Sequence, residues 1–243
     1  MKIIRFDYTT LYLLFILLLC GYIRVGLTIL FIVLFHELGH VLVCLLFKYK
    51  IISVTIYPFG GITRVEKDIN TSTNKEIILS LAGIFMQLIL IPIIKDSIFI
   101  KYNLSIMLFN MLPIIPLDCS NFLKATLNKF FSFKKSYTLY IIISFISILI
   151  YIVYNYKYSI NNYLIISIFF YRIYKDIENY KYIYNRFLLE RYLKKYNFKY
   201  IDTRKGNLDI LKIDTYQYFK EDEKIVSEAK KLKEKFDNGP NKW

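Results

Sequence analysis

The chain has 243 residues, of which 56% are hydrophobic and 18% aromatic, and its mean hydropathy is +0.37. This composition departs from that of soluble domains and predicts a protein with several membrane-spanning segments. The formal net charge of +14 would suit a nucleic-acid-binding protein. However, the basic residues of the first 174 positions lie in loops between apolar runs, so we expect a basic surface facing anionic lipid and no nucleic-acid partner.

Composition divides the chain near residue 174. Residues 1–174 carry 16 Lys and Arg against 7 Asp and Glu, and residues 175–243 carry 17 against 12. We predict a six-span membrane domain over 1–174 and a cytoplasmic, amphipathic and charged C-terminal region over 175–243. The odd number and wide spacing of the three cysteines, Cys20, Cys44 and Cys119, predict no disulfide framework.

The first two apolar runs predict two membrane helices. The run Tyr8–Ile23 could be mistaken for a signal peptide, but it lacks a small-x-small cleavage site, so we interpret it as a span. The second predicted span, about 25–47, contains the only two histidines of the chain, His36 and His40. Apart from these histidines, Glu37 is the only acidic or basic residue between Gly26 and Phe47, and an ionisable residue at such a depth indicates function.

The spacing of these histidines predicts a zinc site. Residues four apart on a helix lie on one face, so His36 and His40 can bind one Zn²⁺ through nitrogen. Glu37 follows the first histidine directly, near enough to take a proton from a water molecule that the metal activates. This is the His-Glu-x-x-His arrangement of zinc proteases, and the metal interpretation is favoured over a chance match because the motif lies within an apolar span.

The segment after the second span predicts two strands. Residues 51–65 contain β-branched residues on both sides of Pro58-Phe59-Gly60-Gly61, and Gly-Gly permits the positive φ angles of a tight turn. A plain surface hairpin and a re-entrant hairpin both fit this pattern. A polar connector over 66–76 precedes a third span, about Ile77–Ile94, in which Ala82-Gly83 permits close helix contact.

The fourth predicted span, Ile98–Leu117, ends in polar residues and prolines. Pro113 and Pro116 should open the helix, and Asp118 follows at its end. Asp118 is either an interfacial residue that ends the span or the third zinc ligand, which such a site requires. Cys44 lies about 12 Å from His36 along the helix axis, too far to share the ion, so Asp118 is the best candidate.

Two further spans, about 137–156 and 158–174, complete a predicted set of six. Basic residues are concentrated on the side that holds both termini, which predicts that both termini are cytoplasmic. In the C-terminal region we expect an amphipathic helix, an irregular segment around Gly206, a charged helix over Glu223–Phe236, and an end to order at Gly239-Pro240. A solvated tail lying on the membrane surface and a region that binds a substrate or regulator are both open.

With these residues assembled, the sequence resembles the site-2 protease family of intramembrane zinc metalloproteases, peptidase family M50, and within it the sporulation branch. The resemblance covers roughly residues 8–175. Three separated segments carry it: His36-Glu37-Leu38-Gly39-His40, Tyr57-Pro58-Phe59-Gly60-Gly61, and the stretch from Asn110 to Asp118, which reads Asn-x-x-Pro-x-x-Pro-Leu-Asp.

The resemblance implies roles for these residues. His36, His40 and Asp118 would hold one zinc ion, Glu37 would be general base and then acid, and Asn110 would help to position the substrate. It also implies that the loop with Phe59, Gly60 and Gly61 lies in the membrane beside the site. The family continues Asp-Gly after the third ligand, where this chain has Cys119. The nucleotide-sensing domain that follows the last span in the sporulation branch does not fit into 69 residues.

We therefore predict an α-helical polytopic membrane protein with about six transmembrane helices, a re-entrant β-hairpin and a small helical cytoplasmic tail. The predicted function is intramembrane proteolysis of a membrane-associated protein, by analogy a sporulation sigma-factor precursor, in a bacterial cytoplasmic or forespore membrane. Expected partners are a membrane-tethered substrate, the lipid bilayer and inhibitory membrane proteins. The alternatives are a catalytically silent binding relative, against which intact Glu37 argues, and a metal transporter, which would need more polar spans.

Overall fold

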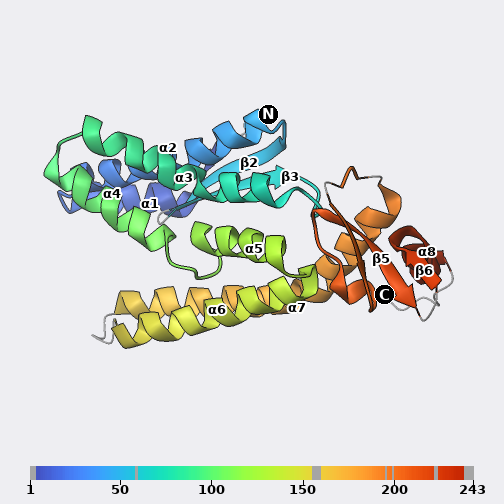
Figure 1. Cartoon of the computed structure of the whole chain (residues 1–243). Helices are drawn as coiled ribbons and strands as arrows, with labels where there is room; N and C mark the ends of the chain where they lie inside the picture. Colours follow the sequence, from blue (N-terminus) through green and yellow to red (C-terminus); the bar gives the residue numbers. More distant parts are fainter. Residues whose placement is uncertain are drawn as a thin grey trace. The chain divides into compact units, whose positions relative to one another are not determined.

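Two packed units make up the chain (Figure 1). The computed structural model describes residues 4–57, 60–154, 160–194, 196–198, 200–221 and 224–237, and all structural statements below refer to these residues. Pro58, Phe59, Gly239 and Pro240, which the sequence singled out, lie outside them. The first unit comprises residues 1–67, 77–112 and 117–119, and the second comprises 68–76, 113–116 and 120–243.

The first unit combines helices with a three-stranded sheet. Its helices are α1 (Tyr8–Leu19), α2 (Ile23–Leu46), α4 (Ser97–Asn110) and most of α3 (Thr73–Ile93). Its strands are β1 (Ile4–Phe6), β2 (Lys50–Tyr57) and β3 (Gly60–Glu66). Buried side chains of α2 and β2 pack together, which places the sheet against the helix that carries the histidines: Val33, Val54 and Ile56.

The predicted hairpin is confirmed as an antiparallel pair of strands. Val54 of β2 faces Thr63 of β3, and the register shifts between Ile51 and Ser53. The sequence did not predict that β1 pairs in parallel with the other edge of β2, with Ile4 opposite Val54. The strand order is therefore β1-β2-β3, which leaves β3 at an edge of the sheet. The re-entrant placement of the hairpin stays a prediction.

Three helices are long and apolar enough to cross a membrane among the described residues: α2, α3 and α6 (Phe133–Tyr154). Three of the six predicted spans thus correspond to helices of spanning length, and the number of six stays a prediction. Helix α1 has 12 residues and α4 has 14. At 1.5 Å per residue they measure about 18 and 21 Å, less than the ~30 Å thickness of a hydrocarbon core.

Helix α4 ends at Asn110, seven residues before the predicted end of the fourth span. Pro113 and Pro116 follow, and each lacks a backbone N–H and disfavours helical geometry in the residue before it. The backbone N–H of Ile115 instead donates to Ser144 Oγ at 2.8 Å. The predicted opening of the helix by its prolines is confirmed, and Asp118 begins a new helix, α5 (Asp118–Phe130).

The second unit contains a pair of long helices and a second sheet. Helices α6 and α7 (Ile160–Leu193) run side by side (Figure 1), and the Tyr137 hydroxyl of α6 donates to the Asp176 carbonyl of α7 at 3.2 Å. The remaining elements are most of α5, β4 (Tyr200–Arg204), η1 (Leu208–Ile210), β5 (Thr215–Glu221), β6 (Lys224–Ser227) and α8 (Glu228–Asp237).

The C-terminal region differs from the helical tail that the sequence predicted. The segment expected to be irregular contains β4 and β5, which pair in parallel. Within the expected helix over Glu223–Phe236, residues 224–227 form β6 and only the residues from Glu228 onward are helical. The predicted amphipathic helix is confirmed as the second half of α7, where Phe187 and Leu188 are fully buried. Because α7 passes residue 174 without a break, the predicted domain division there stays a prediction.

Carboxylates of the second unit hold the polar connector between β3 and α3. Glu190 Oε2 accepts hydrogen bonds from the backbone N–H groups of Ile69 at 2.7 Å and Asn70 at 3.3 Å. Asp214 Oδ2 accepts one from the backbone N–H of Thr73 at 3.1 Å. Thr73 begins α3, so Asp214 supplies an acceptor to N–H groups that a helix start leaves without a partner. The connector is thereby an ordered part of this unit.

Candidate metal centre

Helix α2 places two imidazoles side by side. His36 and His40 lie one turn apart, and their Nε2 atoms are 3.2 Å from each other. Their side chains are 7% and 11% exposed. An uninterrupted apolar segment forms the helix here, so the four-residue spacing seen in the sequence becomes a shared face.

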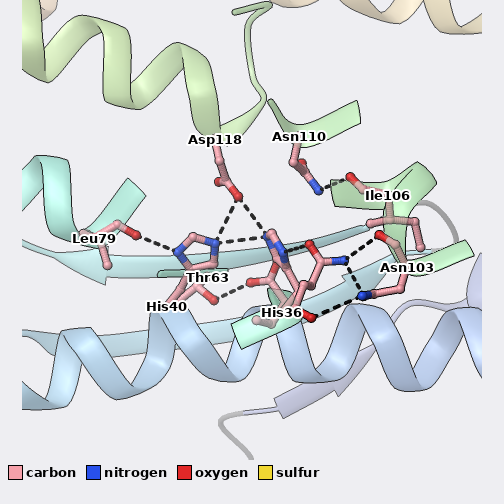
Figure 2. Close-up of polar contacts among 10 residues, drawn as sticks. His36, His40, Thr63, Leu79, Asn103, Ile106, Asn110 and Asp118 are labelled. Atoms are coloured by element: carbon pink, nitrogen blue, oxygen red, sulfur yellow. Dashed lines mark hydrogen bonds and ion pairs between the residues drawn. The ribbon is translucent and has the colours of Figure 1, made fainter. Parts of the chain in front are cut away.

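Asp118 completes the cluster from the start of α5. Its Oδ2 atom lies 2.8 Å from His36 Nε2 and 3.2 Å from His40 Nε2 (Figure 2). These three residues form the only group of at least three potential metal-ligating side chains of the type His, Cys, Asp or Glu found in the described part of the chain. The structure therefore brings together the three ligands that the sequence proposed.

The other ring nitrogens of the two histidines face oxygen acceptors on α3. His40 Nδ1 is 2.9 Å from the backbone carbonyl oxygen of Leu79, and His36 Nδ1 is 3.0 Å from Gln87 Oε1 (Figure 2). A carbonyl oxygen cannot donate, so each Nδ1 carries a hydrogen. In the neutral imidazole, each Nε2 then presents a lone pair to the other and to Asp118.

Three electron-rich atoms thus converge without a hydrogen between them, and only a proton or a metal cation among them relieves their repulsion. Two imidazole nitrogens and a carboxylate oxygen form a donor set that zinc favours. Atoms arranged tetrahedrally around zinc at about 2.0–2.1 Å lie roughly 3.3–3.4 Å apart. The separations of 2.8, 3.2 and 3.2 Å are close to that spacing, so the residues present fit a zinc ion.

Two glycines allow α2 and α3 to approach closely around this cluster. A Cβ atom at Gly39 would lie 2.5 Å from the Ala82 carbonyl oxygen, and one at Gly83 would overlap the His36 imidazole. A side chain at either position would push the helices apart or displace a ligand. Ala82 and Gly83 therefore provide the close helix contact that the sequence predicted.

Glu37 lies beside the cluster but has a different partner. It is 6% exposed, and its Oε2 atom accepts a hydrogen bond from the Thr63 hydroxyl of β3 at 2.8 Å (Figure 2). Gly61 of the same strand lies so close that a Cβ there would overlap the Glu37 side chain. The edge strand of the first sheet thus touches the carboxylate that the sequence assigned as the base.

The residues expected to contact substrate are less tightly associated with the cluster. The Asn110 amide donates to the Ile106 carbonyl oxygen of its own helix at 3.1 Å (Figure 2). Gly60 has a φ angle of +156°, as the predicted turn requires, and Gly61 packs on Glu37. Phe59 lies outside the described residues. The structure therefore leaves a role of these residues in substrate binding as a prediction.

Three polar residues around the cluster and Glu37 were not predicted from the sequence. Gln87 contacts His36 directly, and Asn103 contacts Gln87. Thr63 contacts Glu37 and none of the three cluster residues. Gln87 and Asn103 are fully buried. A polar side chain inside an apolar span is itself a signal of function, and applying that rule to amides as well as to charged groups would have identified both.

Comparison with known proteins gives consistent matches. The family model described as Peptidase family M50 matches residues 24–95. Stage IV sporulation protein FB of Bacillus subtilis (strain 168) is 31% identical over 193 residues, which covers 73% of this chain and 67% of that protein. A Synechocystis sp. protein that carries the name zinc metalloprotease sll0528 is 33% identical over 105 residues, or 37% of this chain and 27% of that protein.

A solved structure shares the fold. The site-2 protease from Methanocaldococcus jannaschii matches with a TM-score of 0.53 and 20% sequence identity. The match covers 72% of this chain and 92% of that chain. At this identity the likeness concerns the arrangement of the backbone.

Proposed function

The chain belongs to peptidase family M50, a family of membrane metalloproteases, and we propose that it is an intramembrane zinc endopeptidase that cuts a membrane-associated protein. The observation that carries this proposal is the convergence of His36 Nε2, His40 Nε2 and Asp118 Oδ2, with both Nδ1 atoms directed at acceptors. In the proposed enzyme these three residues hold one zinc ion.

Each residue around the cluster has a defined task in this proposal. A zinc ion bound there would supply Lewis acidity, which polarises a peptide carbonyl and makes water a better nucleophile. Glu37, adjacent to His36 and held by Thr63, takes the proton from the attacking water. It then delivers this proton to the leaving amide nitrogen. Burial of the site excludes bulk water from competing with these transfers.

The substrate is proposed to bind as an extended strand along β3. A helical peptide bond is shielded by its own hydrogen bonds, so the substrate has to unwind before it is cut. The outer edge of β3 has no strand partner in the described sheet, whereas β2 is paired on both sides. A strand added there would run past Gly61 and Thr63, which touch Glu37, in the mode known as β-augmentation. We place Phe59, Gly60 and Asn110 among the substrate contacts.

Substitution at the hairpin turn tests this binding mode. Gly60→Val places a β-branched residue at a φ of +156° and should reduce cleavage while zinc binding is retained. Gly206→Val is the matched control, because Gly206 has a φ of +141° in the C-terminal sheet region. Wild-type cleavage by Gly60→Val would contradict the strand-addition proposal.

We propose a sporulation sigma-factor precursor as the substrate, since the relative from Bacillus subtilis is by its name a sporulation protein. The proposed location is a cytoplasmic or forespore membrane with both termini on the cytoplasmic side. The distribution of basic loops supports this orientation. Reporter fusions at each terminus would test this orientation. A signal from a fused reporter that is active only outside the cytoplasm would contradict it.

Co-expression with candidate membrane-tethered substrates tests the proposed activity. Wild type should release a product, and Glu37→Gln should release none while binding the same amount of zinc. Glu178→Gln is the matched control, because Glu178 is an exposed partner of Lys175 and should cleave as wild type does. Equal product from wild type and Glu37→Gln would refute the proposal and favour a binding protein without catalytic activity.

A further inference from the structure

We propose that Gln87 and Asn103 form a pair of buried carboxamides that positions His36 for metal binding. Gln87 lies on α3 and Asn103 on α4, so the pair links these two helices. Gln87 in turn contacts His36 on α2. The inference rests on the proposed function, because it takes the cluster of His36, His40 and Asp118 to be a zinc site. It assigns a positioning role to residues that do not contact the metal.

The two carboxamides are interlocked. Gln87 Nε2 donates to Asn103 Oδ1 at 3.2 Å, and Asn103 Nδ2 donates to the Gln87 backbone carbonyl oxygen at 3.2 Å (Figure 2). Gln87 Oε1 then accepts from His36 Nδ1 at 3.0 Å. Both side chains are 0% exposed, so no solvent competes for these hydrogen bonds.

The backbone carbonyl of Gln87 fixes the direction of the whole chain of hydrogen bonds. It can only accept, so the Asn103 amide must direct its nitrogen there and its oxygen toward Gln87 Nε2. The Gln87 amide consequently directs Oε1 toward His36. His36 Nδ1 has to donate to it, and in the neutral ring its Nε2 carries the lone pair that a metal needs.

The two histidines differ in how this tautomer is fixed. His40 Nδ1 donates to a backbone carbonyl, that of Leu79, which a substitution leaves in place. His36 depends on a side chain, and that side chain is itself oriented by Asn103. Leu90 and Phe99, one helical turn from Gln87 and Asn103 respectively, belong to a buried apolar cluster with Ile32, so an apolar pair would suit the packing at positions 87 and 103. What the carboxamides add is a fixed acceptor for His36.

Zinc affinity of the purified full chain in detergent tests the inference, measured by competition with graded chelators and by metal analysis. Gln87→Met keeps the side-chain length but removes the acceptor, and should lower zinc affinity by about 10–100-fold, as loss of such a partner does at other sites. Gln87→Glu keeps an oxygen toward His36 and should bind zinc more tightly than Gln87→Met. Asn103→Leu frees the Gln87 amide to rotate and should lower affinity in the same direction.

Several controls separate positioning from general stability. Ser105→Ala removes an exposed hydrogen bond to Lys101 two residues from Asn103 and should leave zinc affinity unchanged. The double variant Gln87→Met/Asn103→Leu should bind zinc no more weakly than Gln87→Met, because the two residues act in series. Thermal unfolding of every variant, measured in parallel, shows which samples are folded.

The outcomes are distinct. Wild-type zinc affinity in folded Gln87→Met, or equal losses in Gln87→Met and Gln87→Glu, would overturn the inference. If Gln87→Met does not fold, wild-type zinc affinity in folded Asn103→Leu would by itself overturn the inference. Absence of zinc binding by the wild-type chain would instead refute the proposed function, so the two failures are distinguishable.

Discussion

In the first unit three electron-rich atoms, on buried His36 and His40 and on part-buried Asp118, point at one another. In the second unit, by contrast, the buried guanidinium of Arg191 is surrounded by acceptors. Both groups lie almost out of contact with solvent, and both depart from the rule that cores are apolar. The first needs a proton or a metal cation among its three atoms. The second is neutralised by the chain itself, as expected for a structural centre.

The contacts of Arg191 show how this neutralisation is achieved. Its Nη1 donates to the Lys212 carbonyl at 2.7 Å and its Nη2 to the Thr215 carbonyl at 2.8 Å. Glu228 Oε1 lies 3.0 Å from Arg191 Nε, and Glu228 Oε2 accepts from the Gln217 backbone N–H at 3.1 Å. Burial lowers the pKa of Arg191 and raises the pKa of Glu228, so each charge depends on the other for its stability.

Removing the one carboxylate of the first cluster should have the largest effect. Asp118→Asn keeps the shape but loses the charge and one strong ligand, so zinc affinity should fall by more than the roughly 10–100-fold typical of outer partners, and cleavage should be lost. Chelator competition measures this. Asp96→Asn, at an exposed partner of Arg24, is the control and should match wild type. Full zinc affinity in Asp118→Asn would show that the Asp118 carboxylate is not a zinc ligand.

Breaking the ion pair of Arg191 and Glu228 should lower the stability of the protein but leave its zinc content unchanged. Arg191→Met leaves Glu228 buried and unpaired, which should lower the free energy of unfolding by about 3–5 kcal/mol. Hydrogen exchange over 200–237 should rise while zinc content stays constant. Arg204→Met, at an exposed pair with Asp202, should change little. The double variant Arg191→Met/Glu228→Leu should recover part of the loss, and a fall in zinc content would break the distinction between the units.

The first unit was readable from sequence largely because its chemistry is local. The His36 and His40 pair follows from helical spacing, and the prolines before Asp118 mark where α4 ends. With two histidines in the chain, few other residues could complete a zinc site. The support of His36 by Gln87 was harder to read, because the orientation of that amide depends on Asn103 in another helix.

The C-terminal sheet escaped prediction for a different reason. Every second residue from Leu211 to Phe219 is buried, which is the period of a strand. However, two of the buried positions are polar, Thr215 and Gln217, so hydropathy does not show the period. Parallel strands are not joined by a short turn, so no turn sequence predicts the pairing of β4 with β5.

Packing around the first cluster should respond more weakly than its ligands do. A Cβ at Gly83 would overlap the His36 imidazole, so Gly83→Ala should displace that ligand and lower both zinc affinity and stability, the latter by about 1–3 kcal/mol. Gly26→Ala is the matched control in α2, because its Cβ would meet the flexible side chains of Leu17 and Leu14 and none of the three ligands. Equal zinc affinity in Gly83→Ala and wild type would show that the cluster tolerates movement of His36.

Glu37 differs from Asp118 of the first unit, because its carboxylate accepts a hydrogen bond from a side-chain hydroxyl of the chain itself. Thr63→Val keeps the side-chain shape and removes the hydroxyl that donates to Glu37. Hydrogen bonds to charged groups contribute about 1.5–3 kcal/mol, so kcat/KM should fall on the order of tenfold or more. Zinc affinity should stay at the wild-type value, since Thr63 contacts none of the three ligands. Thr28→Val, which removes a bond to the Arg24 carbonyl within α2, should leave both quantities unchanged. A parallel loss of zinc in Thr63→Val would mean that the hairpin supports the metal cluster rather than the base, and would merge two parts of the site that the structure separates.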